Sequence, residues 1–285
     1  MKTFIKLLLI SRPISWPNTA YPFAAAFLVT GGELSWLFWV GTVFFLFPYN
    51  LLMYGINDVF DYESDIKNPR KGGIEGMRES KALHPLILRS SAVLCLPFVL
   101  YLLWAGTLQA NIVLGVVLFF VVAYSAAGLR FKERPFLDSV TSSAHFVGPM
   151  VYALALTGFA SSQILYVLAF FAWGMASHAF GAVQDIVPDR QGKIHSIATV
   201  LGAKTTVRFA LVLYALAGIL LASLGTVATS VVAALSLLYI ANIYRYASVS
   251  DGDSAQTNVA WRRFLWLNYV SGFVVTLALM TFALS

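Results

Sequence analysis

The stretch NDVFDYESD, residues 57–65, directly follows an apolar run that is long enough to form a membrane helix. Within it, Asp58, Asp61 and Asp65 are separated by three and four residues, and Asn57 lies four residues before Asp61. At about 3.6 residues per turn, these spacings place the four side chains on one helical face. Carboxylates this close repel one another, and burial near a membrane adds to the cost. We therefore expect a cation to bind among them.

A second acidic pair, Asp185 and Asp189, follows another apolar run and lies beside Gln184. Magnesium is usually held by one or two carboxylates together with water and phosphate oxygens. Basic residues follow both acidic clusters or lie on the loop between them: Arg70, Lys71, Arg130, Lys132, Arg190 and Lys193. Acids for a metal beside bases for phosphate oxygens predict a Mg²⁺–diphosphate site.

The composition places these clusters in a membrane protein. Of the 285 residues, 59% are hydrophobic and only 11% are charged, and the mean hydropathy is +0.77. Soluble domains carry about 25% charged residues, so a soluble or disordered chain is excluded. The single cysteine, Cys95, cannot form an internal disulfide, and no metal-finger spacing is present.

A helix needs about 20 mostly apolar residues to cross a bilayer. By that rule the chain is an all-α, polytopic bundle of nine transmembrane helices, at residues 13–32, 36–56, 86–106, 110–129, 138–158, 162–182, 207–225, 228–246 and 264–284. We expect a single integral membrane domain, residues 1–285. The acidic ends of the second and sixth spans echo each other, which suggests two four-helix halves with a ninth helix appended.

Charge fixes the predicted orientation. All 19 basic residues lie in the N-terminal segment or near the loops after spans two, four, six and eight, whereas among the 13 acids only Glu33 falls on the other side. By the positive-inside rule the basic side is cytoplasmic. We expect a multi-pass protein of the cell membrane whose N-terminus and active-site loops are cytoplasmic. The net charge of +6 also favours contact with anionic lipid, and no segment is long enough for a nucleic-acid surface.

The two acidic stretches resemble a known family. NDVFDYESD fits the NDxxDxxxD motif and DIVPD fits the DxxxD motif of the UbiA superfamily of intramembrane prenyltransferases. Four longer stretches are similar to the lycopene elongases of bacterial fifty-carbon carotenoid synthesis: SRPISWPNTAYPF, YGINDVFDYESDIKNPRKGGIEG, LRFKERPFLD and WGMASHAFGAVQDIVPDRQGKIHSIATVLGA. The resemblance covers essentially the whole chain.

The resemblance implies a UbiA-type bundle in which two Mg²⁺ ions bridge an allylic diphosphate, with no other cofactor. The metal ligands it implies are Asn57, Asp58, Asp61, Asp65, Asp185 and Asp189, of which Asp58, Asp61, Asp185 and Asp189 are assigned the catalytic role. The predicted substrate-binding residues are Arg12, Arg70, Lys71, Tyr124, Arg130, Lys132, Arg190 and Lys193. The donor it implies is dimethylallyl diphosphate, the acceptor is lycopene or a similar polyene, and other carotenoid enzymes are candidate partners.

One position departs from the family pattern. Members often carry a Tyr-x-x-x-Lys element after the fourth helix; Tyr124 is present here, but the lysine position is Gly128. Arg130 and Lys132 are both candidates for the missing charge. His145 and His178 lie within predicted spans, where each could accept a proton from the product cation or form an interhelical hydrogen bond.

Two alternatives remain open at this point. A sister enzyme that prenylates an aromatic quinone or haem precursor would share both motifs, and Arg12 could then anchor the acceptor carboxylate. A cation transporter would instead place its carboxylates near the bilayer midplane, whereas these clusters fall at cytoplasmic helix ends.

Overall fold

The structure is a computed structural model that describes residues 2–66 and 80–284, with side chains described for residues 4–63, 66 and 80–281. Regular secondary structure in these ranges is helical throughout. The all-α class predicted from the sequence is therefore confirmed.

The chain forms two compact units, and the boundary between them falls inside the helix α8 (Leu137–Thr157). The first unit comprises Met1–Phe131 and His145–Phe159, and the second comprises Lys132–Ala144 and Ala160–Ser285. The single-domain organisation stays a prediction.

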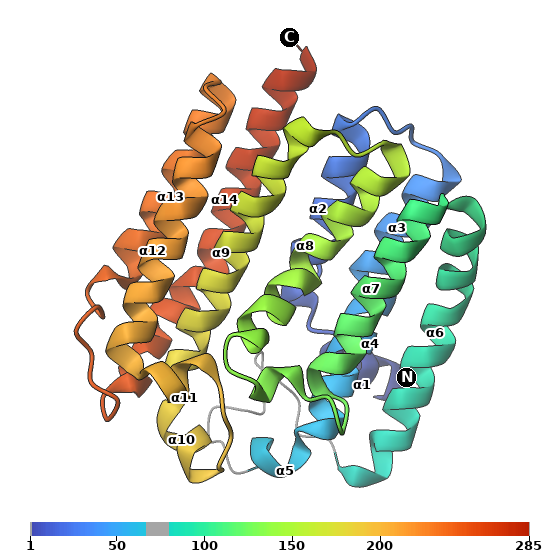
Figure 1. Cartoon of the computed structure of the whole chain (residues 1–285). Helices are drawn as coiled ribbons and strands as arrows, with labels where there is room; N and C mark the ends of the chain where they lie inside the picture. Colours follow the sequence, from blue (N-terminus) through green and yellow to red (C-terminus); the bar gives the residue numbers. More distant parts are fainter. Residues whose placement is uncertain (1, 67–79, 285) are drawn as a thin grey trace. The chain divides into compact units, whose positions relative to one another are not determined.

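The first unit contains the helices from α1 to α7 and the second half of α8, which are labelled in Figure 1. Within it α4 packs against α6 and α7, and α2 packs against α3. Its elements, besides the second half of α8, are α1 (Lys2–Ile10), η1 (Pro13–Ser15), α2 (Pro17–Val29), α3 (Trp36–Leu46), α4 (Pro48–Phe60), α5 (Tyr62–Asp65), η2 (Lys81–Leu83), α6 (His84–Ala105) and α7 (Leu108–Ser125). The short η3 (Phe131–Glu133) crosses the boundary between the units.

Aromatic side chains fill the core of the first unit. Phe23, Phe44, Phe45, Tyr49 and Tyr152 are fully buried there. Most of their ring pairs are edge-on or tilted, as Phe45 and Tyr49 are at 5.2 Å between centroids, whereas Phe23 and Tyr152 are stacked at 6.0 Å. Both arrangements are favourable for aromatic pairs. The Tyr49 hydroxyl donates to the backbone carbonyl of His145 at 3.0 Å, so the polar end of this buried ring is satisfied.

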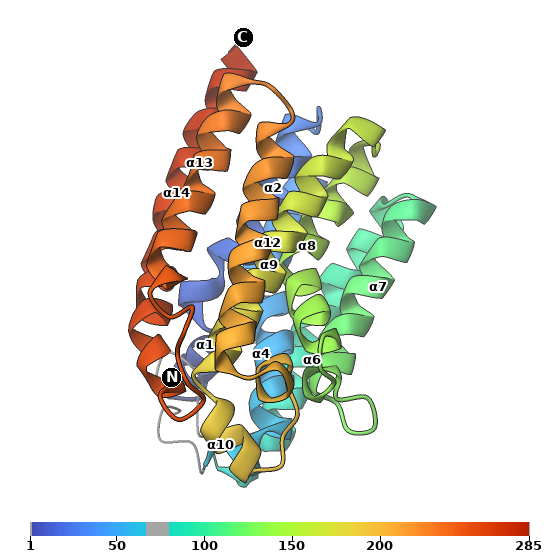
Figure 2. The same cartoon turned by 60° about the vertical axis from the view of Figure 1, so that its left-hand side comes forward.

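The second unit is a group of long helices with two short ones at one end. In both views α12 lies beside α9 and α13, and α13 lies beside α14 (Figures 1 and 2). Its elements, besides the first turns of α8, are η4 (Ser161–Gln163), α9 (Ile164–Val183), α10 (Ile186–Gln191), α11 (Ile197–Leu201), α12 (Ala203–Ala222), α13 (Val227–Tyr244), η5 (Ser254–Thr257) and α14 (Asn258–Leu284). The Tyr214 hydroxyl lies 3.0 Å from Ser177 Oγ in the core of this unit.

Each of the nine expected segments contains helix. In the part of the chain that the structure describes, seven helical segments are long and apolar enough to cross a membrane, so the predicted count of nine spans is not matched exactly. Those seven are Trp36–Phe60, Lys81–Ala105, Leu108–Ser125, Ser161–Val183, Ala203–Ala222, Val227–Tyr244 and Ser254–Thr281. The segment expected at 13–32 is shortened to α2 because Pro13 and Pro17 interrupt its start. The segment at 138–158 keeps its length as α8, but its serine, threonine and histidine residues make it less apolar. The chain is a multi-pass membrane protein.

Candidate active site

The first acidic motif lies where α4 ends. Phe60 is the last residue of α4, and Asp61 occupies the turn before the four-residue helix α5. The predicted continuous helical face is therefore interrupted at Asp61. Asn57 and Asp61 still meet across this last turn, because Asn57 Nδ2 donates to Asp61 Oδ2 at 2.8 Å and to Ser125 Oγ at 3.1 Å. Asp65 ends α5, and its side chain lies outside the described ones.

Asp58 is buried and ion-paired. Its Oδ1 accepts a hydrogen bond of 2.7 Å from Arg12 Nη2, and the Asp58 side chain is only 4% exposed. Arg12 lies at the break between α1 and η1 with a left-handed φ of 52°, and its guanidinium stacks 4.1 Å from the Tyr54 ring centroid. An unpaired buried carboxylate is costly, and the Arg12 guanidinium supplies the counter-charge for Asp58.

Arg130 reaches the same motif from the segment after α7. Its Nη2 lies 3.7 Å from Asp61 Oδ1, and its Nη1 donates to the Phe60 carbonyl at 3.4 Å. Gly128 adopts a φ of +87°, which glycine adopts readily and a lysine would adopt only with strain. This turn therefore has glycine at position 128, and the basic side chain near the motif comes from Arg130, two residues later.

The other residues predicted around the first motif are placed as follows. The Tyr124 ring meets the His145 ring edge-on at 5.1 Å. Lys132 lies in η3 and belongs to the second unit. Arg70 and Lys71 lie outside the described residues.

The second acidic motif lies where α9 ends. Asp185 is the residue before α10, and the Asp189 N–H donates to its carbonyl at 2.8 Å, which closes the first turn of that helix. Both aspartates are half-buried. The neighbouring Gln184 side chain donates to the Gly181 carbonyl at 2.8 Å and accepts from Asn258 Nδ2 at 2.6 Å, so this amide fixes the end of α9 against the start of α14.

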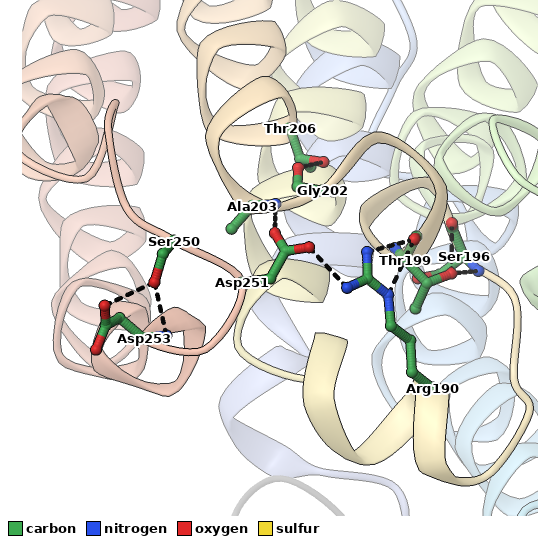
Figure 3. A network of polar contacts seen from close by, with 9 residues as sticks. All are labelled: Arg190, Ser196, Thr199, Gly202, Ala203, Thr206, Ser250, Asp251 and Asp253. Carbon is green, nitrogen blue, oxygen red and sulfur yellow. Dashed lines mark hydrogen bonds and ion pairs between the residues drawn. The ribbon is translucent and has the colours of Figure 1, made fainter.

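The Arg190 side chain forms hydrogen bonds with Thr199 and Asp251 (Figure 3). Its Nε and Nη2 donate to the Thr199 carbonyl at 3.3 and 2.8 Å, and its Nη1 donates to Asp251 Oδ2 at 2.6 Å. The other Asp251 oxygen accepts from the Ala203 backbone N–H at 2.6 Å. That N–H, together with the Arg190 guanidinium, holds the pKa of Asp251 below its usual value. Lys193, the second base predicted here, is exposed and has a left-handed φ of 56°. Substrate contact by either base stays a prediction.

A further buried carboxylate, which was not among the predicted site residues, lies in the same unit. Asp138, in the first turn of α8, is fully buried; its Oδ1 accepts from the Ser139 N–H and its Oδ2 from the Ile197 N–H, each at 2.7 Å. Ser139 Oγ in turn lies 3.0 Å from His178 Nδ1. The interhelical hydrogen bond considered for His178 is therefore present. The sequence signal that could have identified Asp138 is its position, as an acidic residue in the first turn of an expected helix.

The donor atoms of the first motif suit a hard divalent cation. In the described ranges no three His, Cys, Asp or Glu side chains gather as a metal cluster. Asn57, Asp58 and Asp61 nevertheless offer oxygen donors on one short segment, and two of them are buried carboxylates. Magnesium commonly takes one or two carboxylates and completes its shell with water and phosphate oxygens. These residues therefore fit Mg²⁺ bound together with a phosphate-bearing substrate.

A helical membrane protein with an acidic motif after a long helix in each unit is the class that this fold and these residues define. The chain belongs to the UbiA prenyltransferase family, which it matches over residues 19–268. It is a prenyltransferase.

Several known proteins are similar to it. A lycopene elongase/hydratase from Corynebacterium glutamicum is 49% identical over 276 residues, which is 96% of both chains. A lycopene elongase/hydratase from Haloferax volcanii is 30% identical, over 96% of this chain and 88% of the relative. The structure of a UbiA homologue from Archaeoglobus fulgidus bound to DMAPP and Mg²⁺ superposes with a TM-score of 0.66 at 19% identity, over 95% of this chain and 99% of that one. This structural likeness shows a shared fold.

Proposed function

We propose that this chain transfers a dimethylallyl group from dimethylallyl diphosphate to the ends of lycopene in a Mg²⁺-dependent reaction. The observation that carries the proposal is the 49% identity, over 96% of both chains, to a lycopene elongase/hydratase. The two aspartate motifs, which fit the chemistry of a diphosphate leaving group, support it.

The acidic residues would hold two Mg²⁺ ions with the diphosphate. In the first motif these are Asn57, Asp58, Asp61 and Asp65, and in the second they are Asp185 and Asp189. Bound Mg²⁺ supplies positive charge that stabilises the diphosphate as it leaves. Among the bases, Arg130 already lies near Asp61, with 3.7 Å between Nη2 and Oδ1, where it can approach phosphate oxygens. Arg70 is the base that the family pattern assigns to the same task.

The reaction balances without an oxidant or reductant. The allylic C–O bond breaks, its electron pair leaves with the diphosphate, and a dimethylallyl cation forms. The terminal double bond of the polyene attacks this cation, which makes the new C–C bond and leaves a tertiary cation on the acceptor. That cation then loses a proton to form an alkene, or it captures water, which releases a proton to leave an alcohol. Apolar and aromatic walls are needed because water that reached the first cation would yield a prenyl alcohol instead.

The contacts of Arg12 favour a hydrocarbon acceptor over an aromatic acid. An acceptor carboxylate buried in a membrane enzyme needs a cation, because an unpaired buried charge is heavily penalised. Arg12 was the candidate for that partner, and its guanidinium instead pairs with the buried Asp58 at 2.7 Å. The other basic residues in the described membrane-crossing helices lie at the first residues of η2 or in the first two turns of α6, α12 and α14: Lys81, Arg89, Lys204, Arg208, Arg262 and Arg263. A polyene end needs no such partner.

We place the protein in the cell membrane with its N-terminus and its acidic motifs at the cytoplasmic side. The basic loops carry this assignment through the positive-inside rule. The water-soluble donor would arrive from the cytoplasm and the lipid-soluble acceptor from the bilayer. Enzymes that produce lycopene in the same membrane are therefore candidate partners.

The test is expression in cells that accumulate lycopene but make no longer carotenoids, followed by mass analysis of the pigments. We expect products heavier than lycopene by one and two five-carbon units, with or without added water. Cells that express the Asp58→Ala variant at equal membrane abundance should retain lycopene. Unchanged lycopene in the wild-type strain, with prenylated hydroxybenzoate or naphthoate when these are supplied to its membranes, would overturn the acceptor assignment.

A further inference from the structure

Asp251 joins two parts of the second unit that are far apart in sequence. It lies between α13 and η5, and its two carboxylate oxygens have different partners (Figure 3). Oδ2 accepts from Arg190 Nη1 at 2.6 Å, and Oδ1 accepts from the Ala203 N–H, the first residue of α12, at 2.6 Å. A single side chain therefore connects the segment after the second acidic motif to the start of a long helix.

Arg190 extends this connection to α11. Its Nε and Nη2 both donate to the Thr199 carbonyl. Thr199 itself is fixed, because its hydroxyl accepts from the Ser196 N–H at 2.8 Å while Ser196 Oγ accepts from the Thr199 N–H at 3.2 Å. The Arg190 guanidinium thus lies between a rigid helix start and the Asp251 carboxylate.

The backbone beside Asp251 has the conformation that this contact requires. Gly202 has a φ of +76°, and a Cβ built on it would lie 3.1 Å from Asp251 Oδ1. Glycine adopts such a φ readily, and it has no Cβ that would meet the carboxylate. The close approach of the carboxylate to the Ala203 N–H therefore depends on the residue at position 202.

We propose that Asp251 is a positioning residue for the second acidic motif and that it acts through Arg190. Helix α10 has only six residues, begins directly after Asp185 and contains Asp189 beside Arg190. A change in the Arg190 side chain would therefore reorient both aspartates. This inference rests on the proposed function, because it assumes that these aspartates bind Mg²⁺ with the diphosphate.

The exposure of the Arg190–Asp251 pair indicates which property should change when the pair is lost. The Arg190 and Asp251 side chains are 45% and 40% exposed. Ion pairs this accessible contribute little to global stability. Loss of Asp251 should therefore change metal and diphosphate binding much more than the unfolding temperature.

The experiment uses the purified full-length protein in detergent and measures how its unfolding temperature rises with Mg²⁺ at a fixed inorganic diphosphate concentration. We expect Asp251→Ala to raise the Mg²⁺ concentration needed for half of this stabilisation several-fold, with little change in the metal-free unfolding temperature. Asp251→Asn should lie between the two, because its amide oxygen can still accept from Ala203. Steady-state assays should show a raised KM for dimethylallyl diphosphate with a smaller change in kcat.

Asp253→Ala is the matched control. Asp253 lies in the same loop, and its carboxylate accepts local hydrogen bonds from Ser250 Oγ at 2.6 Å and Gln256 Nε2 at 3.2 Å. We expect its Mg²⁺ response to equal that of the wild type. An Asp251→Asn variant that also responds like the wild type would overturn the inference while leaving the proposed function intact. A wild-type protein that Mg²⁺ and diphosphate do not stabilise would overturn both.

A double-mutant cycle tests the route through Arg190. If Asp251 acts through Arg190, the combination of Arg190→Ala with Asp251→Ala should bind Mg²⁺ no more weakly than Arg190→Ala alone. Effects that multiply, as for two independent sites, would contradict the proposed route.

Discussion

Arg12 and Asp58 form an ion pair with 2.7 Å between Nη2 and Oδ1, although 46 residues separate them in the chain. The pair ties the break after α1 to the first acidic motif. It also gives the buried Asp58 carboxylate a counter-charge. If Asp58 binds Mg²⁺ as proposed, the ion and the Arg12 guanidinium would compete for this carboxylate.

Removing Arg12 should therefore expose the cost of a buried carboxylate. We expect Arg12→Gln to lower stability by about 2 to 4 kcal/mol, because one partner of a largely buried ion pair is left alone. The measurement is thermal unfolding in detergent with and without Mg²⁺, and the loss should shrink when Mg²⁺ is present. Arg263→Gln, at an exposed arginine of α14, is the control. An equal loss with and without Mg²⁺ would argue against metal binding at Asp58.

Each acidic motif should be essential for turnover. We expect Asp58→Ala, Asp61→Ala and Asp185→Ala each to lower the rate by on the order of a thousandfold, since loss of a metal ligand removes several kcal/mol of transition-state stabilisation. Glu63→Ala should retain activity, because Glu63 is exposed and pairs with Lys81. Product mass per unit of folded membrane protein is the measurement, and a near-wild-type rate from any of the three would remove that residue from the site.

Metal removal should abolish the reaction. Carboxylate and phosphate oxygens favour Mg²⁺ or Mn²⁺, which share a preference for octahedral oxygen coordination. We expect no prenylated product in excess EDTA and full recovery when Mg²⁺ is restored. Product formed at an undiminished rate in EDTA would contradict the assigned role of the aspartates.

Gly202 should not tolerate a side chain. An alanine there would have to adopt a φ near +76° and place its Cβ 3.1 Å from Asp251 Oδ1. We expect Gly202→Ala to cost about 1 to 3 kcal/mol through backbone strain. Gly115→Ala is the matched control, because Gly115 lies within α7 and its Cβ would meet no atom within 4 Å. Thermal unfolding of both variants decides the comparison, and equal stability would mean that the backbone at 202 relaxes freely.

Acid should release the Asp251 contacts only at low pH. The pKa of Asp251 is lowered, chiefly by the Ala203 N–H, so its contribution is complete above the unfolded pKa of about 3.9 and is lost as the pH falls through the lower folded value. We expect the unfolding temperatures of wild type and Asp251→Asn to differ by a small, constant amount between pH 5 and 8, and to converge below about pH 4. Unfolding temperature against pH measures this, and convergence near pH 6 would place the titration on another group.

The sequence by itself determined the class of protein and the positions of both acidic motifs. Membrane helices and i, i+4 aspartates are local properties of the chain, because they depend on runs of apolar residues and on spacings within a turn or two of helix. In the described structure, seven helical segments are long and apolar enough to cross a membrane. Gly128, where the sequence departs from the family pattern, has a positive φ that suits glycine. The interruption at Asp61 was not expected, because nothing in residues 57–65 marks a turn as a glycine or proline would.

Only the tertiary structure decided which charges face which. Arg12 pairs with Asp58 across 46 residues, Asp138 accepts from Ile197 across 59, and Arg190 donates to Asp251 across 61. In sequence, Arg12 read as a possible acceptor anchor and Arg190 as a phosphate ligand, since an isolated base shows its charge but not its partner. Such pairs form when helix packing within a unit brings distant segments together, and that packing depends on the fit of many side chains at once. The composition of any one segment therefore does not determine which side chains this packing brings together.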